Sequence, residues 1–433
     1  MELELIKKRK QLAILIFLSL VVPYILVYFH RVAPAVVSQQ LMSYYKITGA
    51  ELGNLSAMYF YIYTVMQIPA GIFADFVGPK KVILFGSLIS GIGSIVFGFS
   101  NSYSFALMGR FFVGLGVSVI FISILKLNQN WFDIKQFSFL SGITIFLGNL
   151  GALIATTPLA YASNLWGWQF TFVFMGILGI FFGILSYSII YNYPEEKGLP
   201  PPEGVSKTFL SFREILKGLL SVIKNPYSWF PFISFFGVYG SLMTLQGTWG
   251  IPYLIDLYNI DKFSASQYLM YIAFGLMVGS PLQGYLAKRF FLKSIYFFNI
   301  LIFLICFLII GNYKINLSII PYIFFLIGLT GSSFIFTWTL AKNIHPSELA
   351  GVATGIANMG GFLGAAVLQP LFGYVLDLYW KGEMKDSIRI YDFSAFQSAF
   401  IVLDIFLVVS LFAILASKEH KIQYDSIKKR KNR

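Results

Sequence analysis

Gly71-Ile-Phe-Ala-Asp75-Phe-Val-Gly78-Pro79-Lys80-Lys81 lies between two long apolar runs of the chain. It combines a carboxylate, turn-forming residues and two adjacent cations, as expected of a short loop between two helices. Asp75 falls at the C-terminal end of the first apolar run, where the negative end of the helix dipole disfavours a carboxylate. We therefore predict that Asp75 has a partner elsewhere in the protein.

The composition of the chain is that of a membrane protein. Of its 433 residues, 57% are hydrophobic and only 12% are charged, whereas a soluble domain carries roughly a quarter charged residues. A helix needs about 20 apolar residues to cross a bilayer. The apolar runs are continuous, whereas an outer-membrane barrel requires alternating segments. The sequence therefore predicts an all-α membrane protein.

Twelve apolar runs predict twelve transmembrane helices. They cover residues 11–37, 51–74, 80–100, 103–126, 137–162, 168–191, 229–255, 264–287, 293–311, 317–341, 350–376 and 394–416. The polar stretch 192–228 predicts a cytoplasmic linker between an N-terminal six-helix bundle (1–191) and a C-terminal six-helix bundle with a basic tail (229–433). Within this linker, apolar residues at helical spacing over 209–223 predict a helix on the membrane surface.

Cations distinguish the two sides of the membrane. Most of the 32 Lys and Arg residues lie in the two termini and in the loops after every second apolar run. Cytoplasmic loops carry such an excess, so we predict that both termini are cytoplasmic, in a bacterial inner membrane. The C-terminal run Lys428-Lys429-Arg430-Lys431 would then contact anionic lipid headgroups. We expect no nucleic-acid partner.

The two halves of the chain are related by an internal repeat. A shift of 213 residues carries six residues of the first half onto identical residues of the second, in the pairs Gly71–Gly284, Lys80–Lys293, Gly142–Gly355, Gly148–Gly361, Leu150–Leu363 and Gly151–Gly364. Two parallel six-helix repeats are typical of secondary transporters, whose solute site lies at the midplane between the halves. The same shift carries Asp75 onto Lys288, so the first half has a carboxylate that the second lacks.

Two motifs resemble those of the major facilitator superfamily. The stretch from Gly71 to Lys81 resembles the family's loop signature between its second and third helices, and Arg110 with Gly114 and Gly116 resembles its second motif. The resemblance covers the whole chain in helix number, central linker and repeat, and it implies transport by alternating access. It also implies a gate that includes Gly71, Asp75, Gly78, Lys80, Lys81 and Arg110.

Asp75 is the centre of this predicted gate. In the family, the corresponding Asp helps to hold the two halves together on the cytoplasmic side, which implies the same role for Asp75. Its candidate partners are Lys80, Lys81 and the start of the eleventh helix near Ser347. The alternative is a carboxylate that only fixes the topology or is solvated in its loop.

A looser resemblance concerns bacterial permeases grouped with sugar-phosphate and organic-anion carriers. It rests on His30-Arg31-Val-Ala-Pro34, on Leu125-Lys126 followed by Trp131-Phe132, and on Gln246-Gly247-Thr248-Trp249. Organophosphate exchangers pair an Arg of the first helix with an Arg of the seventh. Arg31 matches the first of these, but the run 229–255 contains no Arg or Lys. The family's antiporter motif in the fifth helix is absent.

Arg31 and Lys126 are the leading candidates for solute binding. A charge inside a span is costly and is a functional candidate by default, and a guanidinium binds a carboxylate or phosphate through paired donors. Each could instead extend its charged end to the membrane interface. Gln246, Trp249 and Tyr253 are spaced to share one helix face, with aromatic packing as the alternative. The remaining candidates are polar or aromatic residues of other spans: Tyr59, Tyr63, Gln67, Asn149, Trp338 and Asn358.

The sequence predicts a transporter and not an enzyme. It has no phosphate-binding glycine loop, no paired-histidine metal helix and no cysteine pair, so no cofactor or metal is expected. The one acid deep within a span is Asp404, in the peripheral twelfth helix. Proton coupling through a cavity carboxylate therefore has little support, whereas facilitated diffusion, exchange or coupling through His30 stay open.

We expect a monomer that moves a small anionic or zwitterionic metabolite by alternating access, in contact with membrane lipid, with the question of a coupling ion left open. One alternative is a uniporter for peptides or other zwitterions. Another is a non-transporting membrane sensor or lipid-handling protein built on the same scaffold.

Overall fold

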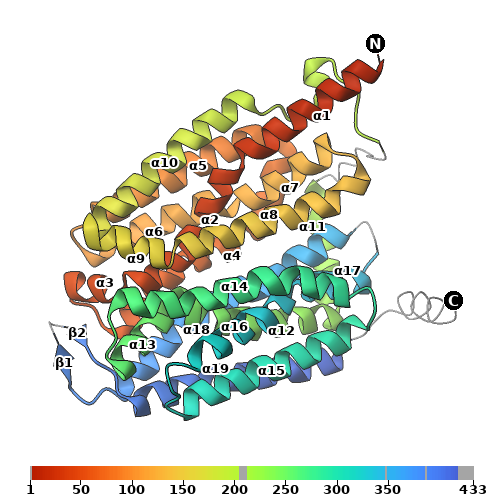
Figure 1. Ribbon diagram of the computed structural model, residues 1–433. Coiled ribbons are helices and arrows are strands. Elements are labelled where there is room, and N and C mark those ends of the chain that lie inside the picture. The colour runs from red at the N-terminus through yellow and green to blue at the C-terminus, as the bar shows by residue number, and fades with distance from the viewer. Residues whose placement is uncertain (1, 204–211, 347–348, 386–387, 418–433) are drawn as a thin grey trace.

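The computed structural model describes residues 2–203, 212–346, 349–385 and 388–417, and its elements are almost all helices (Figure 1). In this part of the chain, eleven helices are long and apolar enough to cross a membrane. A bent pair, Phe139–Ile154 with Thr157–Leu165, makes a twelfth span if it is counted as one. The all-α membrane fold predicted from the apolar runs is confirmed.

The first half of the chain forms its spans from single helices and from pairs of consecutive helices. In chain order they are α1 (Glu2–Ser19) with α2 (Val21–Val36), α4 (Gly49–Phe76), α5 (Pro79–Gly98), α6 (Tyr103–Ser118) with α7 (Ile120–Trp131), α8 (Ile134–Ile154) with α9 (Thr157–Leu165), and α10 (Trp168–Ile189). A short helix, α3 (Ser38–Tyr45), connects the first span to the second. Each predicted run of the first half therefore corresponds to one of these spans.

The second half repeats this plan with one added hairpin. Its spans are α12 (Trp229–Thr244) continued by the π-helical turn η3 (Leu245–Trp249) and α13 (Gly250–Tyr258), then α14 (Lys262–Leu286), α15 (Leu292–Asn312), α16 (Ile320–Gly331) with η4 (Ser332–Ile335) and α17 (Phe336–Ile344), α18 (Ala350–Leu378) and α19 (Phe393–Ala416). Between α18 and α19, strands β1 (Met384–Lys385) and β2 (Ile388–Arg389) pair antiparallel.

The connection between the halves contains η1 (Pro194–Lys197), α11 (Phe212–Lys224) and η2 (Pro226–Ser228). The predicted surface helix over 209–223 agrees with α11 where it can be compared, since 204–211 lie outside the described residues. Val222 is fully buried against Ala341, Ala353 and neighbouring residues of the second half. The helix of the connection is therefore attached to the second half.

Packing within each half follows the internal repeat. A Cβ atom added to Gly151 of α8 would collide with the carbonyl oxygen of Ile25 in α2, and one added to Gly364 of α18 would collide with the carbonyl oxygen of Phe236 in α12. Glycine at these related positions lets two helix backbones approach closely. The two halves thus bring their first and fifth spans together in the same way.

The bundle has two ends, which we name for what they carry. The basic end holds the start of α1 and the loop from Asp75 to Lys81, and the far end holds α3, α9, α13 and the β-hairpin (right and left in Figure 1). The group α1–α10 lies beside the group α12–α19, and α4 packs along α18 where the two groups meet. Any solute path between the halves therefore runs from one of these ends to the other.

Candidate functional site

Arg31 lies between the two halves and has no countercharge in the part of the chain that the structure describes. Its side chain on α2 is only 4% exposed, and Nη1 donates a hydrogen bond to the hydroxyl of Tyr239 on α12 at 2.8 Å. No carboxylate of the described residues forms an ion pair with it, and its Nε atom has no hydrogen-bond partner there. A buried cation without an anionic partner is strongly destabilising. The position therefore suits an anionic ligand.

Aromatic rings surround the guanidinium of Arg31. Its central carbon lies 4.3 Å from the ring centre of Tyr28, 5.4 Å from that of Tyr63 and 5.2 Å from that of Phe362. The faces of aromatic rings attract cations, which offsets part of the cost of burial. Phe362 belongs to α18, so both halves contribute aromatic rings to the environment of the guanidinium.

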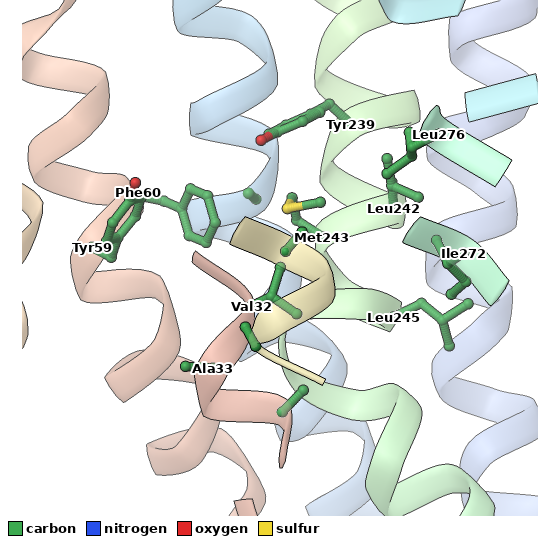
Figure 2. Close-up of a cluster of buried hydrophobic side chains, with 14 of the residues drawn as sticks. Val32, Ala33, Tyr59, Phe60, Tyr239, Leu242, Met243, Leu245, Ile272 and Leu276 are labelled. Carbon is green, nitrogen blue, oxygen red and sulfur yellow. The ribbon is translucent and has the colours of Figure 1, made fainter. Parts of the chain in front are cut away.

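Tyr59 on α4, a predicted site residue, is another of the aromatic rings around the Arg31 guanidinium. Its ring centre is 5.9 Å from the Arg31 guanidinium and its hydroxyl donates to the carbonyl oxygen of Val27 at 3.2 Å. Figure 2 shows Tyr59 at the left of a group of buried apolar side chains and Tyr239 at its top, above Met243. Tyr59 is thus a neighbour of Arg31 that is already hydrogen-bonded within its own half.

A small cavity lies beside Arg31. Its volume is about 20 Å³, which is room for about one water molecule. Its walls come from α2 and α8 of the first half and from α12, η3, α14 and η4 of the second, and its polar lining includes Arg31, Asn149, Tyr239 and Gln246. A metabolite would have to widen this cavity, so the site has a contracted shape in this conformation.

A larger hollow of about 440 Å³ lies at the far end, lined among others by Gln39, Asp256, Asp261, Lys262 and Lys385. It contains none of the residues predicted from the sequence to bind solute. Both oxygens of Asp261 already accept hydrogen bonds from the start of α14. We therefore treat the smaller cavity, which contains the unpaired cation, as the candidate solute site.

Gln67, Asn358 and Trp338 form a chain of hydrogen bonds across the two halves. Asn358 Nδ2 on α18 donates to Gln67 Oε1 on α4 at 2.5 Å, and Trp338 Nε1 on α17 donates to Asn358 Oδ1 at 3.2 Å. Gln67 Nε2 donates to the carbonyl oxygen of Tyr63 at 3.3 Å. These three predicted site residues join the halves on the basic-end side of Arg31, outside the lining of the cavity.

The predicted common face of Gln246, Trp249 and Tyr253 is wrong. Gln246 lines the cavity, whereas Trp249 Nε1 donates to the carbonyl oxygen of Gln369 at 3.0 Å and the Tyr253 hydroxyl donates to that of Ile310 at 2.9 Å. The spacing argument assumed a regular α-helix. The turn η3 is π-helical, which adds a residue to the turn and changes the direction of the side chains that follow. Trp249 and Tyr253 therefore pack inside the second half, as the aromatic alternative expected.

Lys126, predicted to bind solute, instead pairs with Asp75. Its Nζ on α7 lies 2.6 Å from Asp75 Oδ1 at the end of α4. The predicted existence of a partner for Asp75 is confirmed, but the partner lies in the same half, and it is neither Lys80 nor Lys81. Ser347, the other candidate region, lies outside the described residues. In this conformation the ion pair between Asp75 and Lys126 lies within the first half and does not connect the two halves.

The remaining gate residues shape the first half. Gly78 has φ +91° and precedes Pro79 at the start of α5, a backbone conformation that favours glycine. The Lys80 N–H donates to Asn192 Oδ1 at 2.9 Å, and Lys81 is exposed. Arg110 Nη1 donates to the carbonyl oxygen of His30 at 2.9 Å and so ties α6 to α2.

Four glycines of the internal repeat, all near the basic end, border open space. A Cβ atom added to any of them would have no atom of the described residues within 4 Å; they are Gly71, Gly142, Gly284 and Gly355. At the far end, a Cβ on Gly53 would collide with Pro370, and one on Gly373 with Gly49 of the other half. The halves are therefore in tight contact at the far end, whereas these four positions of the basic end border open space.

Asp377 holds the two halves together at the far end, through a set of contacts that we call the Asp377 clamp. This residue of α18 accepts hydrogen bonds from the N–H groups of Gly49 at 3.0 Å and Ala50 at 2.8 Å, the first two residues of α4. It also accepts from Arg389 Nη1 at 2.9 Å and from the Tyr391 hydroxyl at 2.6 Å. A carboxylate at a helix N-terminus is favoured by the dipole and by the free N–H groups. Burial, together with the bond to Asp377, raises the pKa of Tyr391, so its phenol remains a donor.

A second contact across the far end involves Lys262. Its Nζ, at the start of α14, donates to Ser163 Oγ at 2.9 Å and to Gln40 Oε1 at 3.3 Å. Ser266 Oγ and Thr157 Oγ1 lie 3.2 Å apart nearby. Opening the far end must separate these pairs as well as the Asp377 clamp.

We expect Lys126→Gln to shift the protein toward a state with a closed basic end. The substitution removes the partner of Asp75 in the present conformation, and a half-exposed ion pair contributes about 0.2–1 kcal/mol, so the expected shift is about 1.5- to 5-fold in population. The distance between spin labels on exposed Lys81 and Phe290 measures it. In an Asp75→Asn background the same substitution should cause a smaller shift, since the charge that Lys126 pairs with is already absent. An equal shift there would contradict a role for Asp75 as the acceptor.

The chain belongs to the Major Facilitator Superfamily, whose sequence profile matches residues 12–369. This confirms the resemblance recognised in its loop and Arg motifs. The family is one of transporters and not of enzymes, as the sequence predicted. The protein is therefore a multi-pass integral membrane protein of the transporter class.

Bacterial relatives cover most of the chain at low identity. It is 24% identical to the "Probable sulfoacetate transporter SauU" of Cupriavidus necator, over 82% of this chain and 85% of that protein. It is 24% identical to the "Membrane sensor protein UhpC" of Salmonella typhimurium, over 86% and 87% of the two chains. It is 24% identical to a "Probable hexose phosphate transport protein" of Chlamydia pneumoniae, over 87% and 88%.

A solved structure shares the fold. The crystal structure of a bacterial homologue of the human lysosomal transporter Spinster, in an inward-facing and unoccupied conformation, matches with a TM-score of 0.72. The identity is 17%, and the match covers 94% of this chain and 97% of that one. The twelve-helix architecture predicted from the sequence is thus that of known transporters.

Sequence reasoning missed two groups of the site. Tyr28 and Tyr239 contact Arg31 but lie in apolar runs rich in aromatic residues, where nothing singles them out. Asp377 had a signal that was overlooked. Like Asp75, it stands at the C-terminal end of an apolar run, where the helix dipole disfavours a carboxylate.

Proposed function

We propose that the protein carries a small organic anion across the membrane by alternating access, with Arg31 as the principal binding residue. The observation that carries the proposal is the buried guanidinium between the halves, which has a phenol but no carboxylate as its partner. A bound carboxylate, sulfonate or phosphate supplies the missing countercharge and pairs with the planar donors of the guanidinium. Asn149 and Gln246, which line the same cavity, complete the proposed site.

The proposed cycle moves the two halves about this site. With the basic end in the cytoplasm, as the distribution of Lys and Arg favours, the described conformation is closed outward by the Asp377 clamp and loosened inward. Opening the far end breaks the clamp, while Asp75 leaves Lys126 as the basic end closes. The predicted halves, 1–191 and 229–433, are the moving bodies, with 192–228 as the cytoplasmic linker, in a monomer surrounded by lipid of a bacterial inner membrane.

The names of relatives favour an anionic solute. Sulfoacetate and hexose phosphates, named for two relatives, both carry negative charge. Coupling to a cavity carboxylate has no support, because no Asp or Glu of the described residues lines the cavity. Facilitated diffusion or exchange of anions fits these residues best.

A second candidate function is solute sensing. One relative is named a membrane sensor, and a sensor could bind an anion at Arg31 without completing the transport cycle. Peptides and other zwitterions are less favoured, since no carboxylate of the cavity lining would receive their ammonium group.

Uptake into proteoliposomes tests the proposal. Vesicles containing the purified protein should accumulate labelled organic anions in a saturable manner, with empty vesicles and Arg31→Gln protein as controls. Binding of the same anions without saturable uptake would favour the sensor. Transport of neutral sugars or amines that is insensitive to Arg31 would overturn the anion proposal.

A further inference from the structure

Gln246 is buried without a hydrogen-bond partner. Its side chain is 0% exposed, and among the described residues neither Nε2 nor Oε1 has a partner. A buried polar atom left unpaired is strongly destabilising, and native proteins contain few of them. Its amide lines the cavity that contains Arg31, so a molecule in that cavity is positioned to form the missing hydrogen bonds.

The local backbone gives Gln246 this position. It lies in the π-helical turn η3, between the regular helices α12 and α13. Such turns are uncommon and frequently occur at functional sites, because the extra residue redirects the side chains of the turn. Of its neighbours in this turn, Leu245 and Trp249 pack in the core of the protein, and Thr248 Oγ1 is also buried without a partner among the described residues. Gln246 is the residue of the turn that lines the cavity.

The first half presents matching polar atoms to the same cavity. Asn149 on α8 lines it, and Arg31 Nε has no partner among the described residues. Arg31 is also the one cation in the lining of this cavity. Lys126 is paired with Asp75, and the span containing Gln246 has no Lys or Arg. The site therefore offers one positive charge together with neutral hydrogen-bonding groups.

We propose that Gln246 determines specificity by hydrogen bonding to a hydroxyl group of the cargo, so that the carrier selects hydroxylated monoanions over their deoxy analogues. This inference rests on the proposed function, because the anionic group of the cargo binds Arg31. An amide can donate to and accept from a hydroxyl at once. A buried polar group that hydrogen-bonds to a hydroxyl of the cargo discriminates strongly against an analogue without this hydroxyl. With such an analogue bound, the protein group is left unpaired.

Matched pairs of anions test this inference. Competition by glycerate is compared with competition by propionate, and gluconate with hexanoate, in uptake and in thermal stabilisation of the purified protein. We expect the parent to prefer the hydroxylated member about 5- to 100-fold. Gln246→Met keeps the length of the side chain but removes the amide, and it should abolish this preference while anions still bind.

Controls separate a failure of this inference from a failure of the proposed function. Gln283→Leu removes a different buried amide, on α14, which bonds to Asn299 and lies outside the cavity lining; it should leave the preference unchanged. Gln246→Glu should weaken binding of every anion, since it introduces a carboxylate into the cavity that Arg31 lines. An unchanged preference in Gln246→Met, or no preference in the parent, overturns the role of Gln246. If no anion binds the parent, the proposed function itself fails.

Discussion

Arg31→Gln is expected to weaken transport of the organic anion strongly while leaving the protein folded. The substitution removes a charge-assisted hydrogen bond that contributes about 1.5–3 kcal/mol, so anion affinity should fall about 10- to 100-fold. It also removes a buried charge that lacks a countercharge. The thermal stability of the solute-free protein should therefore remain equal to that of the parent or rise. Uptake in proteoliposomes and thermal unfolding measure the two effects.

Two further substitutions make this result specific. Arg31→Lys keeps the charge but loses the planar pair of donors, so it should retain weak binding. Arg110→Gln is the matched structural control: Arg110 is equally buried and also forms no ion pair among the described residues, but it lies outside the cavity lining, and its loss breaks two hydrogen bonds to the carbonyl oxygens of His30 and Leu55. It should lower thermal stability. Parent-like transport by both Arg31 variants would contradict a solute-binding role for Arg31.

Asp377→Asn is expected to open the far end and shift the protein away from the described conformation. Asparagine keeps the shape of the side chain but loses the charge that faces the N-terminus of α4 and Arg389. Charge-assisted hydrogen bonds of this kind contribute about 1.5–3 kcal/mol, which corresponds to a shift of about 10- to 100-fold in population. Spin labels on Asn101 and Met384, at the far end of the two halves, should report longer distances.

The loop between α18 and α19 offers a matched control for Asp377. Asp392 also caps a helix, since it accepts a hydrogen bond from Ala395 N–H at 3.0 Å at the start of α19, but this contact lies within the second half. Asp392→Asn should weaken that cap and leave the label distance unchanged. Equal changes in both variants would mean that the loop is only loosened and that Asp377 is not a clamp.

The arrangement of Asp377 also explains how the clamp can be released. Arg389 and Tyr391 belong to the same half as Asp377 and move with it. In the proposed opening of the far end, α4 moves away while the carboxylate keeps these two partners, and we expect the freed N–H groups at the start of α4 to be exposed to water. Release therefore leaves no buried charge unpaired, which keeps the clamp reversible.

The sequence predicted the spans well and the contacts between them poorly, for a physical reason. Burial of about 20 apolar residues determines a span locally, so hydropathy alone finds it. The partner of a charge depends on distant helices and on the conformation of the carrier. Asp75 violates the dipole rule, and this predicted a partner, but only the fold identifies Lys126. The direction of the Trp249 side chain was predicted wrongly, because a π-helical turn has no clear signal in the sequence.

The unpaired charge of Arg31 has an electrical consequence. A membrane potential acts on each elementary charge that crosses it by up to about 2.3 kcal/mol per 100 mV. In the proposed cycle, the empty carrier reorients with one positive charge at its site that has no countercharge among the described residues, whereas a bound monoanion makes the loaded site neutral. A potential that is negative on the basic side should therefore slow the return of the empty carrier and with it net import. Exchange of one anion for another avoids that step and should be insensitive to voltage.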